Sequence, residues 1–405
     1  MLTKSGASTT LIGHYELLFY LGFVLTSFWV VGLMQGFLSQ YPRLADADRP
    51  AYLFNTYVLL LFVSAVLFSL MCLAKKPLLL ALTGQTDLPH YELFTLYLLV
   101  HTPTFLVENL YLIFAQARKI VGYGLFAFGL QALVILVPIF MGWGLGAAIM
   151  GLLFLALAKH LWLWVELWHK SQFSFSRIMI KELVVLSWPL ILYTLVAGFH
   201  QTFDQWMVNF KYAGDETQFA VFRYGARELP VAIALATALS TALLPVVSAQ
   251  LEEGLAQIKA KTRKLFHLLF PLSIGLMLSS SWFFPRVFNA QFSDSVLIFN
   301  VFLLLVSSRV ILTRTIMVGL GANRAVFGCV LLGLLFNIGM SFLLFPHWGM
   351  AGIAGGTVLA YFAEVALFAF YLYRFHAIRL GQYLDLKWYL LYSVLLLGAF
   401  LWGLA

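Results

Sequence analysis

The stretch ARKIVGYG at residues 117–124 returns in altered form as ANRAVFGC at residues 322–329. A second pair, WGLGAAI at 143–149 and WGMAGIA at 348–354, has the same offset, because 322 − 117 and 348 − 143 both equal 205. Two blocks aligned at one offset without a gap predict an internal repeat, although short Gly/Trp loops can also resemble one another by chance. The sequence therefore predicts two related lobes.

The composition is that of a membrane protein. Of 405 residues, 62% are hydrophobic and 10% are charged, whereas soluble domains have roughly 45–50% apolar and about 25% charged residues. Apolar runs long enough for a helix to cross a bilayer, about 20 residues, recur along the whole chain. We expect an all-α polytopic membrane protein without a soluble domain. The net charge of +8 fits basic cytoplasmic loops and does not call for a nucleic acid partner.

Twelve candidate spans follow from the apolar runs, and the repeat groups them. The N-terminal lobe, 1–181, contains five spans; the C-terminal lobe, 182–386, contains six; and 387–405 forms an appended helix. The predicted spans are 12–38, 52–73, 90–115, 120–141, 145–167, 183–206, 218–248, 265–285, 296–318, 324–345, 350–373 and 388–404.

Lys and Arg in alternate loops set the orientation, because basic residues are enriched in cytoplasmic loops. Most of them fall on one side, which we assign to the cytoplasm, and the opposite side holds only Lys4, Lys75, Lys76, Lys211 and Arg286. Subtracting 205 from the span at 183–206 places its counterpart before residue 1. The first lobe is thus expected to lack its opening helix, through either a shortened start or a genuine eleven-helix core.

The aligned loops fall on the same side of the membrane, so the repeat is parallel. Parallel repeats in transporters are related by an axis along the membrane normal and enclose a site near the bilayer midplane. A central cavity between two lobes is therefore expected.

Longer stretches resemble a known family. An Asp closing one helix (FDQW, 203–206), a long helix ending in LLPVVSAQ (243–250), then GANR (321–324) and FPHWGMAGIAGG (345–356) resemble the polysaccharide-export branch of the multidrug/oligosaccharidyl-lipid/polysaccharide exporter superfamily. The resemblance implies two six-helix lobes around a V-shaped cavity, alternating access, and flipping of undecaprenyl-pyrophosphate-linked sugars between leaflets. The missing first helix departs from this pattern.

Ionisable residues at membrane depth mark candidate sites, since each costs roughly 2.5–3.5 kcal/mol on insertion scales. We predict substrate binding by Arg223, Arg227, Arg309, Arg314, Tyr15 and Tyr224, and gating or ion coupling by Glu16, Glu108, Asp204, Glu228, His101 and Glu364.

The segment VFRYGARELP, 221–230, places Arg223 and Arg227 four residues apart, and on one helix they would share a face. They could bind a pyrophosphate in bidentate fashion, extend to lipid headgroups, or pair with a neighbouring acid. Aligning Glu16 with Arg223 gives an offset of 207, close to 205, so the two could meet across the cavity as an ion-pair gate that a phosphate opens.

The other candidates have alternatives as well. Arg309 is deep in its span, whereas Arg314 is near the cytoplasmic end, where its side chain could extend to the interface. Asp204 is close to the outer end of its helix. His101 could titrate near neutral pH or be a satisfied interior residue, and Pro103, close to Glu108, could mark a hinge. Tyr15 and Tyr224 could stack on sugar rings or pack in the core.

The chain contains no enzyme, cofactor or metal motif. Cys72 and Cys329 have no ligand-like spacing. The family resemblance implies a bacterial inner-membrane flippase of polyprenyl-pyrophosphate-linked oligosaccharide, in contact with membrane lipids and with Na⁺ or H⁺ as candidate coupling ions. A cation-coupled multidrug antiporter of the same superfamily is the alternative, and it would need a cavity dominated by carboxylates. A polytopic glycosyltransferase or polymerase would need a larger outer loop.

Overall fold

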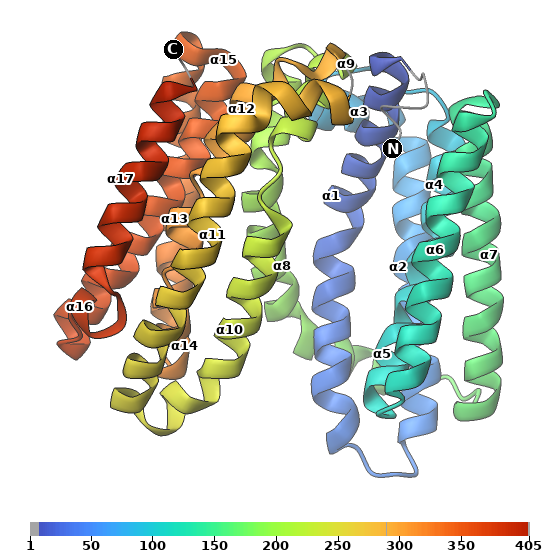
Figure 1. Cartoon of the computed structure of the whole chain (residues 1–405). Helices are drawn as coiled ribbons and strands as arrows, with labels where there is room; N and C mark the ends of the chain where they lie inside the picture. The colour runs from blue at the N-terminus through green and yellow to red at the C-terminus, as the bar shows by residue number, and fades with distance from the viewer. Residues whose placement is uncertain (1–7, 289, 404–405) are drawn as a thin grey trace. The chain divides into compact units, whose positions relative to one another are not determined.

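A computed structural model describes residues 8–288 and 290–403, and every regular element in those ranges is a helix (Figure 1). Lys4, which the charge count assigned to the outer side, lies outside the described residues. The chain forms two compact units, Met1–Ala220 and Val221–Ala405. Each unit is described separately.

Unit 1 is a bundle of long apolar helices, one of which is interrupted, together with the short helix α3. Its elements are α1 (Thr9–Gln40), η2 (Tyr41–Arg43), α2 (Arg49–Leu73), α3 (Lys75–Thr83), α4 (Tyr91–His101), η3 (Thr102–Thr104), α5 (Phe105–Ile113), α6 (Ala117–Phe140), α7 (Gly144–Lys170) and α8 (Arg177–Lys211). Helix α9 (Glu216–Gly225) crosses the boundary between the units.

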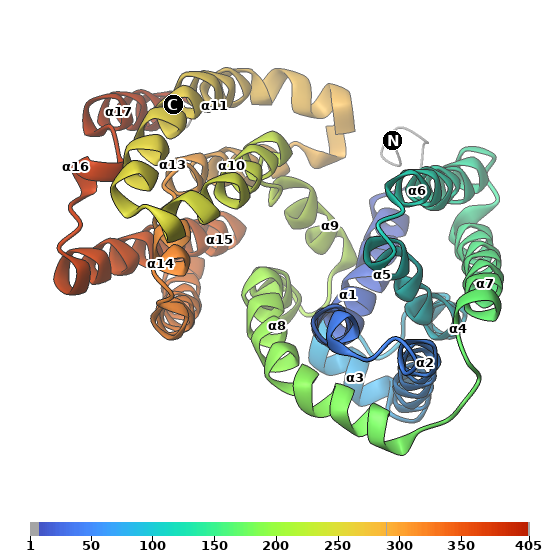
Figure 2. The same cartoon turned by 90° about the horizontal axis from the view of Figure 1, so that it is seen from below.

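Helix α8 lies along α1 at close range (Figures 1 and 2). A Cβ atom on Gly32 would lie 2.7 Å from the Ile191 backbone, and one on Gly36 would lie 2.0 Å from the Ser187 Oγ. The Thr194 hydroxyl donates to a carbonyl of α1 at 2.6 Å. Small residues permit this close approach of two membrane helices. By packing, α8 thus belongs to unit 1, whereas the repeat assigns it to the lobe 182–386. That repeat-based division stays a prediction.

The third span is interrupted at Pro103, as its sequence suggested. Pro103 has no N–H and lies in a 3₁₀ turn between α4 and α5. The Thr102 hydroxyl donates to the Leu98 carbonyl and the Thr104 hydroxyl to the His101 carbonyl, both at 2.6 Å. These bonds satisfy carbonyls around the break, as membrane depth requires.

Unit 2 contains α10 (Pro230–Ala249), α11 (Leu251–Phe288), η4 (Ala290–Phe292), α12 (Ser295–Leu303), α13 (Val306–Arg309), α14 (Thr313–Gly319), α15 (Asn323–His376), α16 (Leu380–Tyr383) and α17 (Leu386–Trp402). Helix α17 packs along α11 (Figure 1). Stacking of Tyr392 on Phe270, with ring centroids 5.4 Å apart, is one contact between these helices.

The spans expected at 324–345 and 350–373 lie within α15, on either side of a kink at Gly349 (φ 54°, ψ −131°). Only glycine adopts this conformation without strain. The two arms then meet closely, since a Cβ on Gly356 would lie 2.7 Å from the Ser341 backbone nitrogen. The Thr357 hydroxyl donates to Asn337 Oδ1 at 3.3 Å, and this bond joins the two arms inside the unit.

Two predicted loops are helical instead. The stretch 251–264, expected as a linker, forms the first turns of α11, because Leu255, Ile258 and Thr262 recur at helical spacing and are buried. The residues after Leu73 form α3, which ends at Gly84 in a left-handed conformation. The hydropathy profile missed the first because its buried residues lie on one face among charged ones, and the second because α3 has only nine residues.

The described residues contain nine helices long and apolar enough to cross a membrane, or ten if the pair Ser295–Arg309 and Thr313–Gly319, bent by 40°, is one span. Helix α15 counts once although it holds two expected spans, and α17 has 17 residues. The chain is thus a multi-pass membrane protein. The count of twelve spans and the missing first helix stay predictions.

Candidate functional site

Two breaks in membrane-depth helices define the candidate site in unit 2. The first lies at residues 226–229, between α9 and α10. Pro230 disfavours helical geometry at the preceding residue, and Leu229 is extended (φ −64°, ψ 110°). Irregular backbone at membrane depth is tolerated where protein buries it or where it lines a water-filled cavity.

The first break corrects one prediction. Because α9 ends at Gly225, Arg223 and Arg227 do not share one helix face. Arg227 lies in the break, with its guanidinium carbon 4.7 Å from the centre of the Tyr224 ring. Tyr224 is buried against Phe292, with centroids 4.8 Å apart, which fits the core-packing alternative for this residue.

The second break lies at residues 310–312, between α13 and α14, and Arg309 ends the helix before it. Its Nε donates to Glu228 Oε2 at 2.7 Å and its Nη2 donates to Glu228 Oε1 at 2.5 Å. Glu228 itself belongs to the first break. A bidentate ion pair thus joins the two breaks, and this geometry is the strongest type of charge-assisted hydrogen bonding.

Tyr361 of α15 packs against this pair in a cation–π contact, with its ring centre 4.1 Å from the Arg309 guanidinium carbon. Three residues further on, Glu364 interacts electrostatically with Arg314 and Arg309. The structure therefore brings together four predicted residues, Glu228, Arg309, Arg314 and Glu364, on three segments of unit 2. Sequence analysis missed Tyr361, although its spacing from Glu364 places both on one helix face.

The exposed fractions of the two side chains show how far water reaches the ion pair. The Arg309 side chain is 30% exposed and that of Glu228 is 19% exposed. The pair is therefore neither fully desolvated nor a surface contact. A guanidinium that binds a carboxylate in this geometry can bind a phosphate in the same way.

The predicted residues of unit 1 lie on several helices. Glu16 on α1 and Asp204 on α8 are buried, and both have interaction partners. Tyr15 packs on Phe19, with ring centroids 4.5 Å apart. His101 stacks on the Tyr97 ring at 4.9 Å, as expected for an interior histidine.

Glu108 of α5 lies near a residue that sequence analysis missed. Lys159 of α7 is 7% exposed, interacts electrostatically with Glu108, and lies 5.7 Å from the Tyr123 ring centre. The neighbouring His160 is fixed between the Tyr57 hydroxyl at 2.9 Å and the Val100 carbonyl at 3.0 Å. In the sequence, the adjacent Lys159 and His160 within the apolar run 145–167 were the signal that could have identified these residues.

The described residues contain no group of three or more His, Cys, Asp or Glu side chains placed to hold a metal ion. Cys72 is exposed and Cys329 is buried, and neither forms a disulfide. Because Glu16 and Arg223 belong to different units, their proposed gate stays a prediction.

Comparison with known proteins identifies the relatives. The model of a family described as "Polysaccharide biosynthesis protein" matches residues 20–297. No curated protein sequence matches.

Solved structures of similar fold include the lipid II flippase MurJ in an inward closed conformation, with 14% identity, coverage of 98% of this chain and 92% of that chain, and a TM-score of 0.74. An inward-facing multidrug resistance MATE family transporter of the MOP superfamily has 19% identity, 93% coverage of both chains and a TM-score of 0.67. A MOP superfamily transporter from Pyrococcus furiosus has 16% identity, coverage of 97% and 86%, and a TM-score of 0.56. These matches confirm the resemblance drawn from the sequence and the all-α polytopic fold.

Proposed function

The chain belongs to the polysaccharide biosynthesis protein family, and on that premise we propose that it is a flippase that carries polyprenyl-pyrophosphate-linked oligosaccharide across the bacterial inner membrane by alternating access. The observation that carries the proposal is the bidentate Arg309–Glu228 pair between two helix breaks. Discontinuous membrane helices commonly form the substrate sites of transporters.

In this proposal, pyrophosphate competes with Glu228 for the Arg309 guanidinium. Two phosphate oxygens can replace both carboxylate oxygens of Glu228 without changing the bidentate hydrogen-bond geometry of Arg309. The released Glu228 then no longer connects residues 226–229 to α13, and the two breaks are free to bend separately. A ligand shifts a conformational equilibrium only through different affinity for the two states, and this exchange supplies such a difference.

Arg227, Arg223 and Arg314 add positive charge along the same segments, and we assign them to the path of the headgroup. Glu364 limits that charge near Arg314. The antiporter alternative would instead use the buried carboxylates Glu16 and Asp204 of unit 1 for a coupling ion, with a cationic drug as substrate.

The proposal is tested in proteoliposomes that contain a fluorescent polyprenyl-pyrophosphate oligosaccharide, with crossing measured by quenching of outer-leaflet label. We expect Arg309→Gln and Arg227→Gln each to slow crossing at least tenfold. The matched control is Arg286→Gln, which removes an arginine whose Nη1 donates to the Trp282 carbonyl within its own helix, at 2.6 Å. Equal crossing rates in all three variants would overturn the assignment of Arg309 and Arg227.

A further inference from the structure

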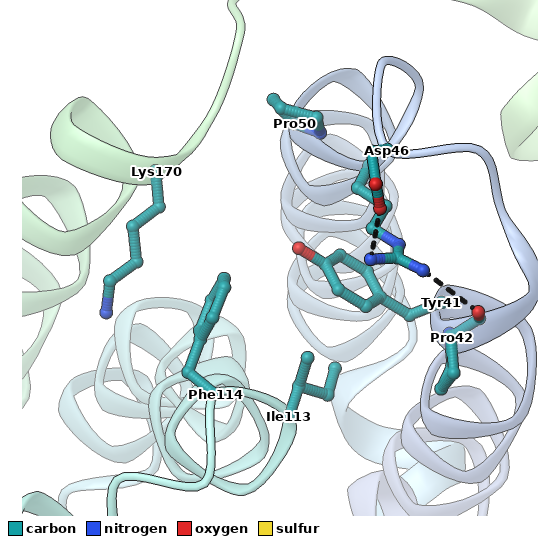
Figure 3. A pocket seen from close by; sticks show the side chains of 8 residues that line it. Tyr41, Pro42, Asp46, Pro50, Ile113, Phe114 and Lys170 are labelled. Carbon is teal, nitrogen blue, oxygen red and sulfur yellow. Dashed lines mark hydrogen bonds and ion pairs between the residues drawn. The ribbon is translucent and has the colours of Figure 1, made fainter.

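A second basic site lies in unit 1. It is a cavity of about 420 Å³ where the end of α1, the start of α2, the end of α5 and the end of α7 converge (Figure 3). The cavity is lined by Tyr41, Pro42, Asp46, Arg49, Pro50, Ile113, Phe114 and Lys170.

Only some of the hydrogen-bond donors of Arg49 have an acceptor. Its Nη1 lies 2.5 Å from Asp46 Oδ1, and its Nη2 donates to the Pro42 carbonyl at 3.0 Å. Its Nε is buried and has no hydrogen-bond partner among the residues that the structure describes. The Asp46 side chain is 90% exposed, and an ion pair with such an exposed partner contributes little to stability. Another anion can therefore displace Asp46 from Nη1.

Lys170 supplies the second cation. Figure 3 shows it across the cavity from Tyr41, with Phe114 beside it. Its Nζ lies 4.9 Å from the centre of the Phe114 ring. Glu166 pairs with Lys170, but the same carboxylate also lies 3.7 Å from Lys119. One carboxylate thus serves two ammonium groups, which leaves positive charge at this end of α7.

The start of α2 adds positive electrostatic potential to the cavity. Asp48, at its N-cap position, makes no side-chain capping hydrogen bond. The first turn of a helix carries partial positive charge that favours an anion; in α2 the Asp48 carboxylate offsets part of this charge and Pro50 has no N–H to donate. Ile113 and Phe114 add an apolar wall at the ends of membrane-spanning helices, on the side that the Lys and Arg distribution assigns to the cytoplasm. Charge beside an apolar wall suits a ligand whose anionic group is attached to an acyl or prenyl chain.

We propose that this cavity binds the phosphate of a lipid headgroup, held by Arg49 and Lys170 after displacement of Asp46. The phosphate could belong to an anionic bulk phospholipid or to a polyprenyl-linked molecule; the chemistry is the same. The inference does not depend on the proposed transport activity, because lipid binding is measured without transport.

The test uses purified full-length protein in detergent, titrated with two probes, short-chain phosphatidylglycerol and farnesyl pyrophosphate, with phosphatidylcholine of equal chain length as the neutral reference. We expect Arg49→Gln and Lys170→Gln each to weaken binding of an anionic probe by roughly tenfold or more, as for the loss of a charge-assisted hydrogen bond. Asp46→Asn should strengthen it, because the competing carboxylate is gone.

The matched control is Arg263→Gln in unit 2, which also removes an arginine paired with an aspartate, Asp385, at 3.5 Å. Loss of phosphatidylglycerol binding alone identifies a bulk-lipid site, and loss of farnesyl pyrophosphate binding alone identifies a site for polyprenyl-linked molecules; either supports the proposal. Unchanged affinities for both probes in Arg49→Gln and Lys170→Gln, or weaker binding in Asp46→Asn, would overturn it. The Asp46→Asn arm keeps the test decisive if an arginine variant fails to fold.

Discussion

The ion pair between the two helix breaks of unit 2 can be tested by a double-mutant cycle of Glu228→Gln and Arg309→Gln. Glu228→Gln leaves one acceptor oxygen where the structure has two, at 2.7 and 2.5 Å. Removing one partner of a fully buried pair costs about 3–5 kcal/mol. Because the Arg309 side chain is 30% exposed, water replaces part of the lost interaction, and we expect about 2 kcal/mol.

Both single variants should therefore lose stability, and the double variant should lose less than their sum, with a coupling energy of about 1.5 kcal/mol. The assay is thermal unfolding followed by intrinsic fluorescence in one detergent, with Arg286→Gln as the control that should leave Tm nearly unchanged. A loss of 2 kcal/mol corresponds to a decrease of about 4–8 °C, on the scale of 2–4 °C per kcal/mol. Additive single effects, with coupling below about 0.5 kcal/mol, would refute the inference that this pair connects the two breaks.

Three further outcomes follow from the packing and charges. Gly32→Ala should lower Tm, because its Cβ would meet the α8 backbone at 2.7 Å, whereas Gly129→Ala, with open space around it, should leave Tm equal or higher. Gly349→Ala should lower stability by about 1–3 kcal/mol in the same assay, since alanine is strained at a φ of 54°; a Tm equal to that of Gly129→Ala would refute this. The hydrogen bond from Lys75 keeps the pKa of Asp87 below its ordinary value of 3.8, and Asp87 raises the pKa of Lys75 above 10.5. The stabilisation from Asp87 is thus complete above about pH 4 and is lost as pH falls through its lowered pKa. Lys75→Gln should therefore be less stable than the wild type between pH 5 and 9, and this difference in stability should shrink below pH 4. A stability difference that persists in acid would contradict this prediction.

The sequence predicted the long helices because apolar runs and the 205-residue repeat are visible in it. Pro103 also predicted a break that the structure contains. The break at 226–229 was missed although Pro230 and the charged residues Arg227 and Glu228 signalled it, because the apolar residues on either side were joined into one span, 218–248. Arg309 was identified as deep, but its partner Glu228 comes from a different segment, 81 residues away in the chain.

Other features depend on tertiary packing that no local pattern specifies. That α8 packs against α1 is determined by Gly32 and Gly36, and these glycines look like any other small residues of a membrane helix. Lys159 was missed because its surroundings are apolar in sequence, and only the folded unit places Glu108 and Tyr123 near it. The cavity beside Arg49 depends on the ends of four helices, and its lining residues are spread along the chain from Tyr41 to Lys170.

The most direct test of the central claim compares two cargoes in the wild-type protein. Proteoliposomes receive either a labelled polyprenyl-pyrophosphate oligosaccharide or the cationic dye ethidium, and passage of each across the bilayer is measured with and without a Na⁺ or H⁺ gradient. Our account predicts that the lipid-linked sugar crosses faster than in protein-free vesicles, while ethidium does not. Gradient-driven ethidium transport without movement of the lipid-linked sugar would contradict the account and favour a multidrug antiporter.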